Sequence, residues 1–149
     1  MIKKAILFLH RWLGLISGII VIILSITGCI FVFQKEFTNW MRSDVMYIEA
    51  QSQRLSVEDM YNLTSEALGV EQLNYGLTTY KDESQSWTAF SYIPNSEPSW
   101  TYFGAIADYR TAYLNPYTGE TLEIIDEEQD FFQIVKGIHW SLLLSTPIG

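Results

Sequence analysis

The sequence predicts a membrane-anchored α+β protein, with an N-terminal transmembrane helix and an extracytoplasmic domain in which one helix packs on an antiparallel sheet. The first observation is an uncharged, apolar run over residues 12–33. The second is the order that follows it, one amphipathic helical pattern and then β-rich segments separated by turns. The third is an apolar helical pattern near the C-terminus, which predicts the start of a second transmembrane helix. We expect three parts, at residues 1–42, 43–125 and 126–149.

The apolar run has the length of a membrane anchor. As a helix, residues 12–33 cover roughly 33 Å, which is enough to cross a hydrocarbon core of about 30 Å. A cleaved signal peptide is the alternative, but this run exceeds the usual apolar region of such a peptide, and no small-x-small cleavage site precedes Lys35. We therefore expect an uncleaved anchor in contact with the lipid bilayer. The single cysteine, Cys29, lies within it, which excludes a disulfide inside the chain.

Charge gives the anchor a direction. Lys3, Lys4 and Arg11 precede or begin the apolar run, whereas all 17 acidic residues lie between Glu36 and Asp130. By the positive-inside rule we expect the N-terminus in the cytoplasm and the acidic domain outside it. A domain this acidic does not bind nucleic acid through phosphate contacts, since those require Lys and Arg.

One face of the predicted helix carries mostly small residues below a histidine. Steps of three and four residues place these on one side: His10, Gly14, Gly18, Val21, Ser25 and Gly28. Gly14 and Gly18 also form a GxxxG motif. In lipid, such a stripe indicates close packing. Two interpretations stay open, another helix or a flat cofactor that lies against the glycines beneath His10.

The domain outside the membrane follows a helix-then-meander order. Residues 34–42 extend the anchor as a helix, and residues 45–50 resemble a short strand. Ser56 is an apt N-cap for a helix that Gly69 ends. Strands are predicted at residues 73–80, 86–93, 100–110 (with Gly104 as a bulge), 111–115 and 120–125, with a tight turn at residues 116–119.

The C-terminal segment begins with acids and becomes apolar. We expect residues 126–130 (DEEQD) to start a helix that continues through His139 to Leu144. The acids suit the positive end of a helix dipole, and cation binding is the less favoured interpretation. Too few residues follow Lys136 to cross a membrane as a helix. Aromatic residues of the outer domain, such as Trp87 and Tyr113, could stack on a ligand but are more often core.

Three stretches together resemble the PepSY-associated transmembrane family of bacterial inner-membrane proteins. The first is residues 9–15 (LHRWLGL) with the later pair at residues 27–28 (TG). The second is the turn at residues 115–120 (NPYTGE), typical of PepSY modules, after the helix start at residues 55–58 (LSVE). The third is residues 138–144 (IHWSLLL). The resemblance implies a PepSY-like outer domain and a place in the bacterial inner membrane.

Members of that family include iron-regulated proteins, some of which reduce ferric siderophores with b-type haem held by histidines. By position, His10 and His139 would be axial ligands of haem iron, with Gly14 and Gly18 beside the cofactor. The resemblance thus implies electron transfer to a ferric siderophore or other iron chelate outside the cytoplasm. The family continues with further transmembrane helices, so this sequence resembles an N-terminal portion, and alone we expect it to be inactive as a reductase.

The topology separates the two histidines. His10 lies near the cytoplasmic end of the anchor and His139 where the chain returns from outside, with roughly 30 Å of membrane between them. They would therefore serve two haems, each completed by missing helices or another subunit. An alternative function is a membrane-anchored binding or inhibitory module for a peptide, a peptidase or an envelope partner, without redox activity; a non-functional gene remnant is a third possibility.

Overall fold

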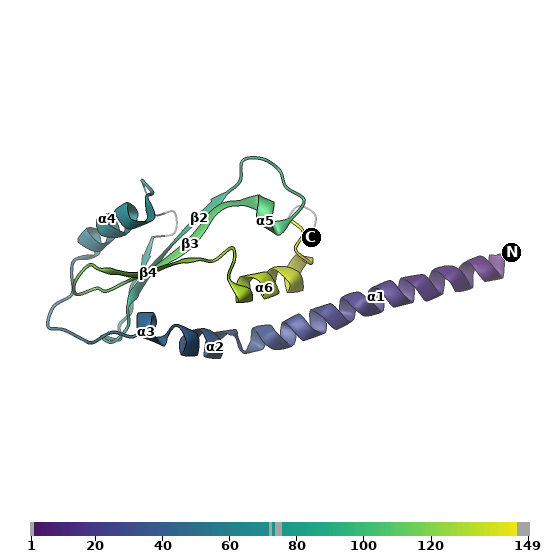
Figure 1. Ribbon diagram of the computed structural model, residues 1–149, viewed down its shortest axis with the longest axis horizontal. Coiled ribbons are helices and arrows are strands. Elements are labelled where there is room, and N and C mark those ends of the chain that lie inside the picture. Colours follow the sequence, from purple (N-terminus) through teal and green to yellow (C-terminus); the bar gives the residue numbers. More distant parts are fainter. Residues whose placement is uncertain (1, 72, 74–75, 146–149) are drawn as a thin grey trace.

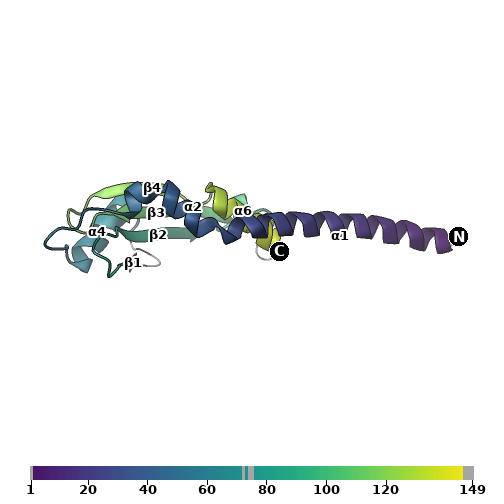
Figure 2. The same ribbon diagram turned by 90° about the horizontal axis from the view of Figure 1, so that it is seen from below.

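The computed structural model describes residues 2–71, 73 and 76–145, and a long helix projects from a small sheet domain (Figures 1 and 2). The elements in chain order are α1 (Ile2–Val32), α2 (Gln34–Met41), α3 (Ser43–Met46), α4 (Val57–Leu68), β1 (Leu77–Thr78), β2 (Trp87–Pro94), α5 (Tyr102–Ala105), β3 (Ile106–Leu114), β4 (Thr121–Asp126) and α6 (Phe131–Ser141). The prediction of a long apolar helix joined to an α+β domain is confirmed.

Among the described residues, α1 is the one helix long and apolar enough to cross a membrane. Its N-terminal part extends away from every other element in both views (Figures 1 and 2). A break at Phe33 separates it from α2, and α3 follows directly. The predicted strand at residues 45–50 is wrong, because the amides of Val45 and Met46 bond to the carbonyl of Arg42 and keep the chain helical. Tyr47 then makes an isolated antiparallel bridge with Gln85.

The helix α4 begins and ends where the sequence predicted. The Ser56 side chain accepts a hydrogen bond from the Asp59 amide at 3.0 Å, as an N-cap does. Gly69 ends the helix in the left-handed conformation, at φ 68°. The Arg110 guanidinium donates to the Leu68 carbonyl at 2.9 Å, which ties the C-terminal end of α4 to β3.

Four strands form one antiparallel sheet in the order β1-β2-β3-β4. Among the described residues of the predicted strand at 73–80, those of β1 alone pair in the sheet. Gly76, at φ 73°, turns the chain just before β1. Residues 74 and 75 lie outside the described residues. The predicted strands at residues 100–110 and 111–115 are one strand, β3, after the helical turn α5, which contains Gly104 in place of a bulge.

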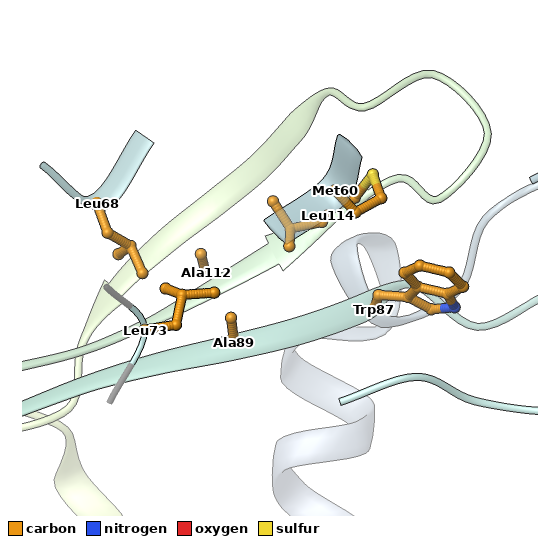
Figure 3. Packing of buried hydrophobic residues seen from close by; sticks show 7 residues of the cluster. All are labelled: Met60, Leu68, Leu73, Trp87, Ala89, Ala112 and Leu114. Atoms are coloured by element: carbon orange, nitrogen blue, oxygen red, sulfur yellow. The ribbon is translucent and has the colours of Figure 1, made fainter. Parts of the chain in front are cut away.

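The hydrophobic core lies between α4 and one face of the sheet (Figure 3). It consists of Met60, Leu68, Leu73, Trp87, Ala89, Ala112 and Leu114. The register pairs Ala89 with Ala112 and Trp87 with Leu114, so the small side chains leave room for α4. Burial alternates along β2, and the other face of β2 and β3 is turned away from α4.

The helix α6 begins later and ends earlier than predicted. Asp126 belongs to β4, where it pairs with Arg110, and Asp130 is the N-cap that starts the helix at Phe131. The helix ends at Ser141, because Leu142 and Leu143 take left-handed conformations with φ 53° and 61°. The predicted continuation to Leu144 is therefore wrong. Residues 146–149 lie outside the described residues, and a second membrane segment stays a prediction.

Candidate functional site

The contact between α6 and α1 holds the more informative of the two predicted ligands, His139. These helices pack together (Figures 1 and 2). The imidazole of His139 lies over Gly28, and a Cβ added at Gly28 would sit 3.0 Å from the ring atom Cε1. Glycine at this position is thus what lets the ring approach the α1 backbone. The small-residue stripe of α1 is used for close packing at its Gly28 end.

Hydrogen bonding fixes which ring nitrogen of His139 carries the proton. Nδ1 lies 3.0 Å from the Leu24 carbonyl oxygen, which can only accept. Nδ1 must therefore be the donor in that bond. The Thr27 hydroxyl lies 3.3 Å from Nδ1, and it already donates to the Ile23 carbonyl at 2.8 Å. A neutral imidazole held this way has its lone pair on Nε2, the arrangement found in histidines that ligate metals.

An open groove runs along α1 beside this ring. It has a volume of about 540 Å³ and is lined by Val21, Leu24, Ser25, Gly28, Cys29, Val32 and His139. The lining is mostly apolar, and the Ser25 hydroxyl is bonded to its own helix, at the Val21 carbonyl. The groove therefore brings the His139 side chain and the Cys29 thiol beside a mostly apolar surface.

The other predicted site residues lie apart from this contact. His10 is exposed on α1, roughly 27 Å along the helix axis from Gly28. A Cβ added at Gly14 or Gly18 would meet nothing within 4 Å, so no described side chain packs on that end of the stripe. His10 and His139 do not converge, and the role of either as a haem ligand stays a prediction.

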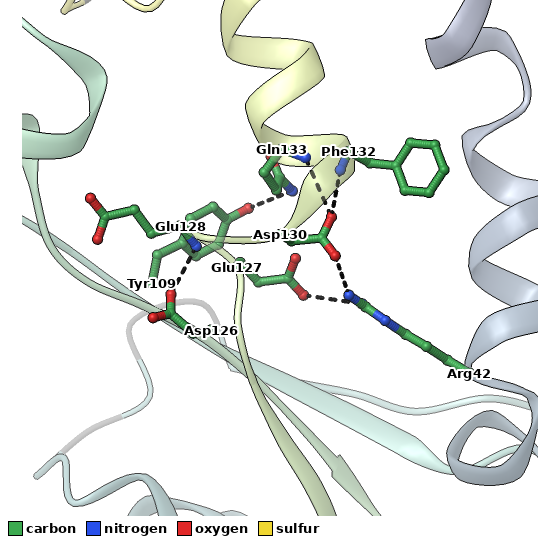
Figure 4. Close-up of polar contacts among 8 residues, drawn as sticks. All are labelled: Arg42, Tyr109, Asp126, Glu127, Glu128, Asp130, Phe132 and Gln133. Atoms are coloured by element: carbon green, nitrogen blue, oxygen red, sulfur yellow. Dashed lines mark hydrogen bonds and ion pairs between the residues drawn. The ribbon is translucent and has the colours of Figure 1, made fainter.

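An ion-pair cluster holds α6 in place beside the exit from α1 (Figure 4). Arg42, between α2 and α3, contacts Asp130 at 2.5 Å and Glu127 at 3.6 Å. The other carboxylate oxygen of Asp130 accepts from the amides of Phe132 and Gln133, as an N-cap does. Burial alone would lower the pKa of Arg42, but a hydrogen bond with Tyr113 and the two carboxylates outweigh it and raise that pKa.

Sequence reasoning assigned these acids to a helix start and did not foresee Arg42 as their partner. The favoured interpretation, acids at a helix N-terminus, is correct for Asp130 alone. The sequence contained only a weak indication that Arg42 pairs with these acids. Arg42 is one of the few cations within an acidic segment, but sequence separation hid the acids that it reaches.

The second face of the sheet borders a polar cavity of about 370 Å³ next to this cluster. Its lining is rich in hydroxyl and amide groups: Gln34, Thr38, Tyr80, Gln85, Ser86, Thr88, Tyr109, Thr111, Tyr113 and Gln133, beside Arg42, Met46, Phe90, Glu127 and Asp130. Some of the outer-domain aromatics therefore border a cavity, whereas Trp87 is core.

Comparison with known proteins gives one family. None of the curated proteins matches this sequence. Residues 7–149 match the family model described as the PepSY-associated TM region. That match covers nearly the whole chain, including both histidine motifs and the sheet domain between them. The chain therefore belongs to the PepSY-associated transmembrane family.

Proposed function

We propose that this membrane protein carries electrons through b-type haem to a ferric siderophore or other iron chelate outside the cytoplasm. The observation that supports this most directly is the hydrogen bond from Nδ1 of His139 to the Leu24 carbonyl. That bond orients the ring and engages Nδ1, which leaves Nε2 as the nitrogen that would ligate iron.

The residues around His139 suit a haem in part. Gly28 admits a close approach, and the groove beside the ring is apolar and open to a flat molecule. Bound haem would supply one-electron chemistry. This chain would provide one imidazole ligand, held in its tautomer through Leu24, and an apolar surface of α1 beside it. A second ligand would come from further helices or from another subunit.

His10 would serve a second haem near the other side of the membrane. The positive-inside rule orients α1 with His10 towards the cytoplasm and His139 towards the acidic outer domain of a bacterial inner-membrane protein. Two haems at these depths would make a path for electrons from the cytoplasmic side to the outer face. Gly14 and Gly18 would give the first of them the same close access to α1 that Gly28 gives His139.

Difference spectra test the proposal. The chain is expressed in bacterial membranes, alone and together with any in-frame downstream sequence, and reduced-minus-oxidised spectra are recorded. We expect a b-type haem band in at least the longer form, and loss of part of that band in His139→Ala and in His10→Ala. Ser17→Ala is the matched control, since that hydroxyl bonds its own helix at Gly14. Absence of a haem band from both forms would refute the proposal.

A second candidate function is a binding module without redox activity. The polar cavity on the second face of the sheet favours it, because hydroxyl and amide groups are suited to a peptide or another hydrogen-bonding partner. The two functions differ in their dependence on histidine. His10→Ala and His139→Ala would leave capture of a peptide, peptidase or envelope partner intact and would abolish haem-dependent iron reduction.

A further inference from the structure

A second cavity, of about 430 Å³, is lined by residues of β2, α5, β3 and α6 and so lies between the sheet and α6. Its aromatic lining comes from Phe90, Tyr92, Tyr102, Tyr109 and Trp140. The rings of Tyr92 and Tyr109 pack edge to face, with their centres 5.3 Å apart. Aromatic walls of this kind are suited to a planar ring.

A turn with unusual backbone angles follows α6 beside this cavity, whose lining includes Leu144 and Ser145. Leu142 and Leu143 both have the left-handed backbone conformation, which residues other than glycine rarely adopt. The turn brings the following residues back against the segment before α5. The Tyr102 amide donates to the Leu143 carbonyl at 2.9 Å, and the Ser145 amide donates to the Trp100 carbonyl at 3.1 Å. Backbone strain held in place by such pairing is often found at binding sites.

Two hydroxyl groups in the cavity wall lack a partner among the described residues. The Tyr102 hydroxyl and the Ser145 hydroxyl are both buried without a hydrogen bond. Burial, with smaller effects of Tyr109 and Glu128, raises the pKa of Tyr102 to about 12, so this phenol stays protonated at neutral pH and acts as a donor. Buried polar groups are nearly always paired in native proteins, so a donor without a partner matches an acceptor on a ligand.

The cavity also carries one positive charge. Lys136 is the only charged residue among its described lining residues, and its ammonium lies 4.9 Å from the centre of the Trp140 ring. The outer domain carries a net negative charge, and Glu127 and Glu128 lie close enough to Tyr102 to affect its pKa. An anionic group would therefore be held at Lys136 and not at the Tyr102 end.

We propose that this cavity binds a small aromatic carboxylate that carries a second oxygen acceptor. The ring lies among the aromatic side chains, the carboxylate pairs with Lys136, and the second oxygen accepts a hydrogen bond from Tyr102. The cavity is distinct from the contact of His139 with Gly28 and Leu24 of α1, because His139 is not among the residues that line it.

Fluorine NMR of a probe tests each contact separately. The full chain in phosphatidylcholine nanodiscs is titrated with 3-fluoro-4-hydroxybenzoate, with its neutral amide, and with 3-fluorobenzoate, which lacks the hydroxyl group. We expect saturable binding of the first probe and weaker binding of the other two. Lys136→Met should weaken binding of the hydroxybenzoate about tenfold and leave the amide unaffected, since a hydrogen bond to a charged group has about that effect.

Tyr102→Phe tests the second contact without disturbing the fold, since its hydroxyl has no partner among the described residues. It should weaken binding of the hydroxybenzoate and leave 3-fluorobenzoate unchanged. Lys81→Met is the matched control, an exposed lysine away from the cavity, and should bind as the wild type does. Near-ultraviolet circular dichroism checks that each variant is folded. The proposal is overturned if the folded wild type shows no saturable binding up to about 10 mM probe, or if Lys136→Met binds the carboxylate unchanged.

Discussion

Arg42 joins the exit from the membrane helix to the start of α6, and its removal should destabilise the outer domain. The side chains of Arg42, Glu127 and Asp130 are 17%, 11% and 17% exposed. Arg42→Met keeps most of the aliphatic length but removes the charge and the hydrogen bonds (Figure 4). It leaves two mostly buried carboxylates without their cation.

The expected loss in the free energy of unfolding lies between the values for exposed and for fully buried ion pairs. Exposed ion pairs contribute about 0.2–1 kcal/mol, and removal of one partner from a fully buried pair costs about 3–5 kcal/mol. Since Arg42 and both acids are mostly but not wholly buried, we expect Arg42→Met to cost about 2 kcal/mol. Asp130→Asn retains an N-cap, because an Asn side chain also accepts from the helix amides. The coupling between the two changes should be about 1–1.5 kcal/mol.

The assay is thermal unfolding of the wild type, both single variants and the double variant, as full chains in one mild detergent. For an outer domain of about 100 residues, each 1 kcal/mol corresponds to roughly 4–8 °C in Tm. We expect Arg42→Met to lower Tm by about 8–16 °C. Lys81→Met, which removes an exposed cation, is the control and should stay close to the wild type. A coupling below about 0.5 kcal/mol, the value of an exposed pair, would refute this reasoning.

Two further predictions concern the sheet domain. Gly119→Ala should destabilise it more than Gly69→Ala: both positions have positive φ, but a Cβ at Gly119 would also lie 2.7 Å from Leu63, whereas one at Gly69 meets nothing. Urea unfolding should give a cost of about 1 kcal/mol for Gly69→Ala, and equal costs would contradict the contact. The other prediction concerns Asp108. Burial alone would raise the pKa of this carboxyl group, but hydrogen bonds from Arg110 and Ser91 outweigh burial and lower that pKa. Its stabilisation is therefore complete above its unfolded pKa of about 3.9 and is lost as pH falls through the lower folded value. Asp108→Asn should reduce Tm clearly at pH 7 and much less near pH 3, and an equal reduction at both would be the contrary result.

Local patterns predicted the elements whose causes are local. The N-cap Ser56 and the left-handed Gly69 define α4 within the sequence of the helix itself. The tight turn before β4 also follows from local chemistry, since the Asn115 carboxamide accepts from the Tyr117 amide and Gly119 supplies the positive φ. Such bonds span few residues, so residue type alone indicates them.

Errors arose where distant partners decide the conformation. The turn α5 was predicted as strand, but the Tyr102 amide is bonded to Leu143, far along the chain. The start of α6 was placed five residues early, because pairing of Asp126 with Arg110 extends β4. Neither partner can be read from a local pattern.

In the candidate site too, the features with local causes were predicted and those that depend on distant contacts were not. A stripe of small residues correctly indicated close packing on α1, and Gly28 makes such a contact. That the packed side chain is the imidazole of His139, bonded to a main-chain carbonyl, could not be predicted, because it depends on how α6 returns beside α1. The partner of Arg42 was missed for the same reason.

The central claim is that His139 holds a haem near the outer face, and the haem content per chain tests it most directly. The protein is purified with its haem from bacterial membranes as the wild type, as His139→Ala and as the control Ser17→Ala. Haem is quantified against protein from the reduced pyridine adduct. We predict that His139→Ala loses about half of the wild-type haem, since one of two sites is removed, while the control retains all of it. An unchanged haem content in folded His139→Ala would contradict the claim.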